Sequence, residues 1–446
     1  MIESVLVANR GEIARRVIRT ARRMGIRAIA VYSEADSGLP YVCEADEAVP
    51  IGAAPAASSY LDARAVLGAA RRTGAAAIHP GYGFLAENAE FAAEVIDTGL
   101  TWVGPPPAAI DQVGDKINAR NFMEQAGVPV AAGSREPVTD AAAAVAEARR
   151  IGYPVMIKAA AGGGGIGMSA AANEAELRAG FETARSRAER FFGSADILLE
   201  RFIEQARHVE VQILGLNDGR VLALGERDCS VQRRHQKVAE ETPSPGVTPG
   251  LRARMLAAAI RAGEAVGYRG AGTVECLVDA KSQDFVFLEM NARIQVEHPI
   301  TEMVTGIDLV EQQLLIAGGG DVSFPPASVR SAGHAVELRV YAEDPRRFLP
   351  SPGVITEWAE PSGPGIRVDA GYTAGNEVTP FYDPLLAKLC VSGASRAEAL
   401  RRARGAVAAF RVSGPRTNLP FHAELLDSEE FSSGDYDTSV VARLRP

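Results

Sequence analysis

The first hundred residues alternate between short apolar runs and amphipathic segments. Ser4–Ala8 and Arg27–Tyr32 are apolar runs of strand length, and between them the apolar residues of Glu12–Met24 recur at helical spacing. The alternation continues with helices expected over Leu61–Thr73 and Asn88–Thr98, and with strands expected over Ala75–His79 and Thr101–Val103. This repeated order predicts an α/β domain over residues 1–113. Its first strand–helix turn lacks G-x-G-x-x-G, which argues against dinucleotide binding.

Two further regions follow the run Pro105–Pro107. The second covers residues 114–320 and ends in the glycines Gly318–Gly320. The third covers residues 331–440, with a strand expected over His334–Ala342 and a helix from Arg396 to about Phe410. The whole chain is therefore expected to be a mixed α/β and α+β protein of three units.

A hairpin with two glutamates is the most informative pattern in the second region. Thr273–Val278 and Phe285–Glu289 read as strands on either side of a polar turn, and a symmetric hairpin places Glu275 opposite Glu289. Facing like charges repel, and a divalent cation such as Mg²⁺ would turn them into a binding site. An exposed hairpin with solvated charges is the alternative, although the apolar neighbours favour a core position. Polar residues then recur at every second position, at Asn291, Arg293, Gln295 and Glu297.

A glycine-rich loop follows a strand that ends in lysine. Tyr153–Lys158 has strand character, and glycine occupies positions 162–165 and 167. Consecutive glycines lose much conformational entropy on folding, but they let backbone N–H groups wrap an anion, and Lys158 adds a positive charge. The loop lacks the GK[ST] of a Walker A motif. A mobile surface loop remains the alternative.

Three weaker patterns also suggest ligand contacts. Glu200–Ile203 follows an apolar strand, as a segment that reads a planar base would. The stretch Glu226–Lys237 is rich in cationic side chains, which suits a small anion. His79–Phe84 lies at the carboxyl end of a strand, where open α/β sheets bind ligands, although a structural turn is equally consistent.

Composition narrows the class of protein. The chain has 446 residues and a formal net charge of −9, so no global basic field points to nucleic acid or an anionic membrane. Its four cysteines form no CxxC pair, and no apolar run reaches membrane-span length, so the expected compartment is the cytoplasm. The arginine pairs Arg15–Arg16, Arg71–Arg72 and Arg401–Arg402 are interpreted as solvated helix faces.

Several long motifs, in order, resemble one known family. They are ANRGEIA, HPGYGFLAEN, the Lys158 strand with its glycine loop, ERDCSVQRRHQK, GAGTVE, EMNARIQVEHPITEM and LPSPG. The chain resembles biotin carboxylase, the ATP-grasp component of biotin-dependent carboxylases such as acetyl-CoA carboxylase. The resemblance implies an N-terminal Rossmann-like domain at 1–113, an ATP-grasp domain at 114–320 with a mobile lid at about 131–203, and a C-terminal domain at 331–440.

The resemblance implies an ATP-dependent ligase that carboxylates biotin on a separate carrier protein. Glu275 and Glu289, with Asn291 beside them, would bind Mg²⁺ or Mn²⁺. The ATP-binding residues it implies are Lys116, Lys158, Gly163, Gly164, Gly165, Glu200, Ile203, His208, Gln232 and His235.

Bicarbonate and biotin contacts follow from the same resemblance. Bicarbonate would rest against Lys237, Arg293, Gln295 and the Val296 backbone. Glu297 would remove its proton, and the carboxyphosphate formed would release CO₂. Arg339 would stabilise the negative charge on the biotin ureido oxygen. Tyr82 and Gly83 would lie near the biotin ring.

Two residues depart from the family pattern. Ile166 stands in the glycine loop where the family usually has a cation, and Arg201 replaces a common lysine whose contact is mainly through the backbone. Ile166 motivates the alternative of an inactive or regulatory nucleotide-binding paralogue. Another ATP-grasp carboxylate ligase is a further alternative, which Arg339 and the Arg293–Glu297 tail disfavour.

The resemblance also implies partners. The chain lacks the Met-Lys-Met segment that accepts biotin, so a separate biotin carboxyl carrier protein and a carboxyltransferase subunit are expected. A homodimer is expected too, with Arg16 and Arg19 on the helix that stand-alone family members use. The final carboxyl acceptor stays open among acetyl-CoA, propionyl-CoA, pyruvate and others.

Overall fold

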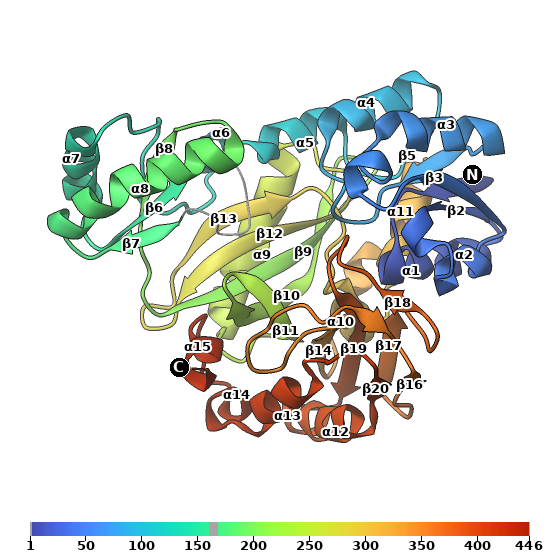
Figure 1. Ribbon diagram of the computed structural model, residues 1–446. Coiled ribbons are helices and arrows are strands. Elements are labelled where there is room, and N and C mark those ends of the chain that lie inside the picture. Colours follow the sequence, from blue (N-terminus) through green and yellow to red (C-terminus); the bar gives the residue numbers. More distant parts are fainter. Residues whose placement is uncertain (1, 160–167, 446) are drawn as a thin grey trace.

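The computed structural model describes residues 2–159 and 168–445 (Figure 1). The N-terminal unit, blue in Figure 1, is a parallel sheet in the order β3-β2-β1-β4-β5 with helices packed against it. Its elements are β1 (Ser4–Val7), α1 (Gly11–Arg23), β2 (Arg27–Ser33), α2 (Pro40–Glu44), β3 (Glu47–Gly52), α3 (Ala63–Thr73), β4 (Ala77–His79), α4 (Ala89–Asp97), β5 (Thr101–Trp102) and α5 (Pro107–Gly114).

The expected α/β order is confirmed, and two of the differences from it have a clear physical reason. The edge strand β3 was not anticipated, because Glu47–Gly52 is short and contains a proline, features that sequence reasoning assigns to loops. Helix α3 begins at Ala63 rather than at Leu61. The Asp62 carboxylate accepts a hydrogen bond from the backbone N–H of Ala65, so Asp62 is the N-cap and the helix starts after it.

The segment expected to form the lid, at about 131–203 and called the lid below, projects to one side of the molecule (Figure 1). It has its own apolar core and an antiparallel sheet in the order β7-β6-β8. Its elements, with the helix that leads into it, are α6 (Lys116–Gln125), α7 (Ala141–Ile151), β6 (Val155–Ala159), β7 (Ser169–Ala171), α8 (Glu174–Phe192) and β8 (Ile197–Arg201). Residues 160–167, which include Gly163, Gly164, Gly165 and Ile166, lie outside the described residues.

One antiparallel sheet joins the second and third regions. Its order is β13-β12-β9-β10-β11-β14-β19-β17, so strands on both sides of the boundary at residues 320–331 are hydrogen-bonded through β11 and β14. The central elements are β9 (Ala206–Gly215), β10 (Val221–Arg233), β11 (Gln236–Thr242), α9 (Pro249–Ala265), β12 (Gly270–Asp279), β13 (Phe285–Asn291), α10 (His298–Thr305) and α11 (Leu309–Ala317).

The C-terminal region adds strands to this sheet and covers it with helices. Its elements are β14 (His334–Tyr341), β15 (Gly353–Val354), β16 (Glu357–Ala359), β17 (Ile366–Ala370), β18 (Glu377–Val378), β19 (Leu385–Gly393), α12 (Arg396–Ala409), β20 (Arg411–Ser413), α13 (Leu419–Asp427), α14 (Glu429–Ser433) and α15 (Val440–Leu444). None of the helices in the described ranges is long and apolar enough to cross a bilayer.

Candidate active site

Lys237 lies at the centre of a cluster of buried carboxylates on the shared sheet. Its Nζ atom is 2.5 Å from Glu210, 2.8 Å from Glu275 and 2.8 Å from Glu297. Burial disfavours the charged amine, but the three carboxylates outweigh it and hold the pKa of Lys237 well above its usual value. Lys237 therefore stays charged and brings together residues from β9, β12 and the start of α10.

The two hairpin glutamates face each other as expected. Glu275 pairs with Glu289 in the β12–β13 register. Glu275 is neutralised by neighbours, since His208 Nε2 lies 2.7 Å from its carboxylate and Asn291 Nδ2 donates to Oε1 at 3.0 Å. Burial raises the pKa of Glu275, but Lys237 and His208 outweigh that effect and the pKa is lowered. For Glu289, burial and the charge of Glu275 raise the pKa.

The oxygen donors of this pair fit a divalent cation. Two half-buried or buried carboxylates on one face suit Mg²⁺ or Mn²⁺, and a cation would relieve the repulsion that raises the pKa of Glu289. His208, Glu210 and Glu275 also each offer a ligand atom, all within 4.8 Å of one another. The Asn291 side-chain oxygen accepts from Arg293 Nη2 at 2.8 Å, so Asn291 has another partner in this conformation.

The polar tail after β13 converges on the site without continuing the strand. The chain is irregular over residues 292–297, and α10 begins at His298. Arg293 nevertheless donates to Asn291 and, through Nη1, to Gln295 Oε1 at 3.1 Å. Gln295 Nε2 in turn donates to Glu275 Oε1 at 3.3 Å. Hydrogen bonds therefore bring these side chains together, although residues 292–297 form no regular strand.

Glu297 and Arg339 form the end of the cluster. Arg339 Nη2 on β14 is 3.0 Å from Glu297 and 2.6 Å from Glu240. Burial raises the pKa of Glu297, but Lys237 and Arg339 outweigh burial and hold it well below its usual value. An ionised, fully buried carboxylate between two cations is available as a proton acceptor.

The expected biotin contacts lie beside Arg339. The Tyr82 hydroxyl donates to the Glu12 carboxylate, and the Arg339 charge acts on that hydroxyl. Lys388 Nζ is 2.9 Å from Glu12 and also donates to the Val296 carbonyl at 2.9 Å, which fixes the backbone of the polar tail. Gly83 is exposed in the same turn, with a φ of 68° that favours glycine.

The expected nucleotide contacts occupy the lid and the strands next to it. Lys158 on β6 pairs with Glu200 on β8. The charge of Lys116, at the start of α6, opposes the effect of burial on the pKa of both Glu200 and Glu289. Ile203 is half-buried just after β8. These residues thus extend from the lid to the hairpin glutamates.

A Gln232–His208 contact and the turn that holds His235 complete the expected nucleotide side of the site. Gln232 Nε2 lies 2.6 Å from His208 Nδ1. His235 sits in the β10–β11 turn with a φ of 68°, and burial followed by the charges of Lys158 and His208 lowers its pKa. His235 is therefore neutral and close to the lid lysine.

Comparisons with known proteins identify the family of this chain. Residues 1–110 match the biotin carboxylase N-terminal domain, residues 115–324 the carbamoyl-phosphate synthase L chain ATP-binding domain, and residues 337–443 the biotin carboxylase C-terminal domain. A biotin carboxylase of Halalkalibacterium halodurans is 49% identical over 99% of this chain and 97% of that protein. The chain belongs to the biotin carboxylase family.

Solved biotin carboxylases share the fold. The Campylobacter jejuni biotin carboxylase–β,γ-ATP complex has a TM-score of 0.96 and 43% identity, covering 99% of both chains. The biotin carboxylase domain dimer of Hydrogenobacter thermophilus 2-oxoglutarate carboxylase, with MgADP, ADP and bicarbonate, has a TM-score of 0.95 and 43% identity, covering 99% of this chain and 98% of that chain. The ATP-grasp fold, the ligase class and the use of ATP, Mg²⁺ and biotin, inferred from the motifs, are confirmed for this family member.

Sequence reasoning missed two residues of this candidate site. Glu210 contacts Lys237, and its signal was present: His208, Glu210 and Gln212 alternate within an otherwise apolar strand. Glu87 accepts from Arg293 Nε at 2.8 Å and from the Ala292 N–H at 3.1 Å. Glu87 belongs to the HPGYGFLAEN motif, but only the fold brings that motif to the polar tail.

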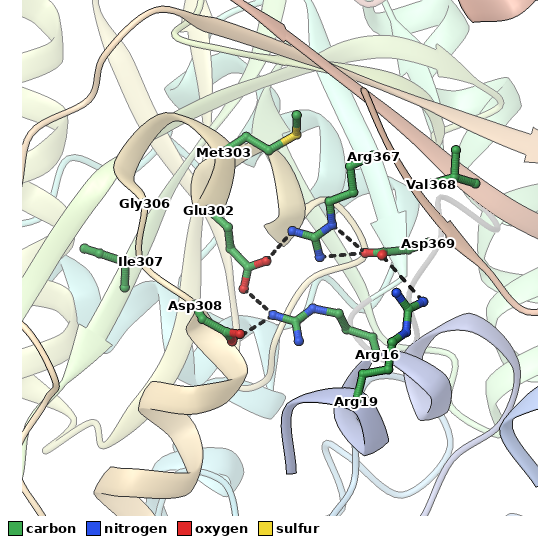
Figure 2. Close-up of a pocket in the computed structure, with 10 residues that line it drawn as sticks. All are labelled: Arg16, Arg19, Glu302, Met303, Gly306, Ile307, Asp308, Arg367, Val368 and Asp369. Carbon is green, nitrogen blue, oxygen red and sulfur yellow. Dashed lines mark hydrogen bonds and ion pairs between the residues drawn. The ribbon is translucent and has the colours of Figure 1, made fainter. Parts of the chain in front are cut away.

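The solvated-face interpretation was wrong for Arg16. Arg16 is 6% exposed, and its Nη2 atom is 2.8 Å from both Glu302 and Asp308. Figure 2 shows Arg16 pointing into a pocket of about 410 Å³, where Arg367 bridges Glu302 and Asp369. The amphipathic pattern identified only the apolar stripe of α1, whereas α11 and β17 pack against its charged side and α10 contributes Glu302.

Proposed function

We propose that this protein uses ATP and bicarbonate to carboxylate biotin carried by a separate carrier protein, for use by a separate carboxyltransferase. The observation that carries the proposal is the run of ion pairs from Glu275 through Lys237 and Glu297 to Arg339. It links a pair of carboxylates suited to a nucleotide-bound cation with an arginine suited to a developing oxyanion.

Bicarbonate would bind between Lys237 and Arg293, with Gln295 and the Val296 backbone beside it. The guanidinium of Arg293 is held by Glu87 and Asn291, so its planar fork is oriented before the substrate binds. Glu297 would accept the bicarbonate proton, because its lowered pKa keeps it ionised at neutral pH. The oxygen left by that proton would attack the ATP γ-phosphate, forming carboxyphosphate and ADP.

Biotin would then be carboxylated next to Arg339. Carboxyphosphate would break into CO₂ and phosphate, and the phosphate would take the N1′ proton of biotin. Arg339 would stabilise the negative charge that develops on the ureido oxygen, and the resulting nucleophile would attack CO₂. Tyr82 and Gly83 would border the biotin ring.

Glu275 and Glu289 would hold the divalent cation that ATP brings, with Asn291 beside them. Such a cation neutralises phosphate charge during phosphoryl transfer. Lys116 and Lys158 would contact the phosphates, with Gly163–Gly165 over them. Glu200 and Ile203 would lie at the adenine, and His208, Gln232 and His235 at the sugar and phosphates.

Bicarbonate-dependent ATP cleavage tests the proposal. ADP release would be measured with ATP, Mg²⁺, bicarbonate and free biotin, and with each component omitted in turn. We expect a slow rate with bicarbonate alone and a faster rate with biotin. An equal rate without bicarbonate would rule out the assigned chemistry and favour another ATP-grasp ligase.

We further propose a cytoplasmic homodimer that uses the surface around α1 and the pocket of Figure 2. Arg19 is 47% exposed beside Asp369, at the mouth of this pocket. Reversing its charge in Arg19→Glu should weaken association without disturbing the buried Arg16 pairs. Arg22→Glu, on the same helix and 53% exposed, is the matched control. Equal sedimentation of the two variants would contradict this interface.

A further inference from the structure

Two buried carboxylates face each other directly behind Arg339. Glu240 on β11 and Glu337 on β14 are register partners across the junction between the central and C-terminal strands. Glu240 is 1% exposed and Glu337 is 0% exposed. Directly opposed residues of an antiparallel pair have Cβ atoms about 4.5–5.5 Å apart, so two ionised carboxylates would repel strongly here.

The hydrogen bonds of this pair are incomplete. Glu240 Oε1 is 2.6 Å from Arg339 Nη2, but neither Glu240 oxygen receives a well-aligned hydrogen bond from any described residue. Cys390 Sγ donates to Glu337 Oε2 at 3.3 Å, and Glu337 Oε1 has no donor among the described residues. A proton on Glu337 Oε1 would convert one unpartnered acceptor into a donor on the sheet face that it shares with Glu240.

Nearby cations do not suffice to neutralise both glutamates. Arg339 is shared with Glu297, and Lys237 is shared among three other carboxylates. Lys388, the register partner of Arg339, is 2.9 Å from Glu12. Lys388 and Arg339 both act on Glu337, but each is shared with other carboxylates, and burial together with the charge of Glu240 outweighs them. This balance favours retention of one proton.

We propose that Glu240 and Glu337 hold one proton between them at neutral pH, with Glu337 as the acid, and that this pair positions Arg339 for biotin. Glu240 would then keep the single negative charge that orients the guanidinium, while Arg339 remains a net cation toward the substrate. The positioning half of this inference rests on the proposed role of Arg339, whereas the shared proton does not.

The titration behaviour agrees with the geometry. Burial and the charge of Glu240 raise the pKa of Glu337 well above its usual value. Burial, opposed by Arg339 and assisted by Glu297, also raises the pKa of Glu240. The rise is larger for Glu337, which is therefore the member that holds the proton. The next glutamate along β11, Glu241, points to the other face, bonds Arg396 at 2.7 Å and His334 at 2.6 Å, and has its pKa lowered to about 2 despite burial.

Infrared difference spectroscopy of the full chain without substrates tests the proton. The carbonyl stretch of a protonated carboxyl lies apart from the carboxylate bands and shifts in D₂O. At pH 7 we expect this band in the wild-type protein and its loss in Glu337→Gln, which mimics the neutral acid and should fold normally. Glu241→Gln, which removes an ionised carboxylate, should retain the band. An identical band in wild type and Glu337→Gln would overturn the proposal.

Kinetics test the positioning role separately. Glu240→Gln removes the anion beside Arg339 and should raise KM for free biotin on the order of tenfold, with a smaller change in kcat and in KM for ATP. Glu337→Gln, which retains a neutral side chain at that site, should change KM for biotin less. If the band is lost in Glu337→Gln but Glu240→Gln leaves KM for biotin unchanged, the shared proton stands and the positioning role fails.

Discussion

At the scale of single residues, Glu275 and Glu289 are chemically identical, yet their surroundings differ. Glu275 has Lys237, His208 and Asn291 as partners, so its folded pKa is lowered and its ionised form stabilises the fold. The folded pKa of Glu289 is raised by burial and Glu275, so its charge costs stability at neutral pH. The facing pair therefore predicts opposite effects on stability for the same substitution.

Glu275→Gln and Glu289→Gln should each abolish turnover but shift the melting temperature in opposite directions. Glu275→Gln leaves Lys237 and His208 with less compensation, a loss of about 3–5 kcal/mol in comparable buried pairs. Glu289→Gln removes a repulsion and should melt no lower than wild type. Thermal melts in chelator at neutral pH, with ADP-release assays in Mg²⁺, measure both effects. Near-normal turnover in either variant would make the hairpin purely structural.

Arg339→Ala should lower biotin carboxylation by roughly a hundredfold or more, the usual loss of one preorganised oxyanion donor. Slow bicarbonate-dependent ATP cleavage should survive, because Arg339 is proposed to act after carboxyphosphate forms and Lys237 still contacts Glu297. Both rates are measured on protein whose melting curve is first checked, since Glu240 and Glu297 lose a partner. A parallel fall in both rates would reassign the residue to nucleotide binding or folding.

At the scale of elements, the glycine-rich loop between β6 and β7 is where the sequence departs from its family. Ile166 cannot supply the cation that the family pattern has there, which removes one charge-assisted contact of about 1.5–3 kcal/mol. Lys158 in β6 precedes the loop in sequence, and its charge acts on His235 in the β10–β11 turn. The loop sequence therefore predicts weak ATP binding rather than loss of catalytic activity.

Ile166→Arg should lower KM for ATP, with a smaller effect on kcat if chemistry rather than lid closure limits the rate. ATP titrations of both proteins, with and without the cognate biotin carrier, measure the change. Ile166→Leu controls for side-chain size without charge. An unchanged or raised KM in both settings would show that Ile166 is no defect, and the inactive-paralogue alternative would lose its motivation.

At the scale of the whole molecule, the lid and the shared sheet differ in how they are held. The lid has its own small core, whereas β11 and β14 join the central and C-terminal strands by an unbroken hydrogen-bonded ladder. Glu241 reinforces this junction through His334, Arg396 and the Tyr436 hydroxyl at 2.6 Å. The two regions therefore form one structural unit despite the glycine linker between them.

Hydrogen exchange should consequently show two levels of protection. Amides of β6 and β8 should exchange through local opening of the lid, well below the free energy of global unfolding, and ATP should slow them. Amides of β11, β14 and β19 should exchange together at the global limit. Exchange of β14 and β19 before β11 would show that the C-terminal region unfolds alone.

The sequence by itself determined the local features of this protein. Alternation within Thr273–Asn291 predicted that Glu275 faces Glu289, and the register confirms it. The register shift between Glu275 and Cys276 was not predicted. The strand–helix order predicted the N-terminal α/β unit, and ordered motifs identified the family. In each case the interacting residues are close in sequence or carry a recognisable pattern.

The tertiary structure alone decided which distant residues meet. Three contacts join segments about a hundred or more residues apart. They are Arg16 with Glu302, Glu87 with Arg293, and Glu240 opposite Glu337. A sequence pattern specifies which face of an element is polar, but it does not specify what packs against that face. Whether a charge is solvated, paired or protonated depends on that partner, because burial and neighbouring charges set its pKa.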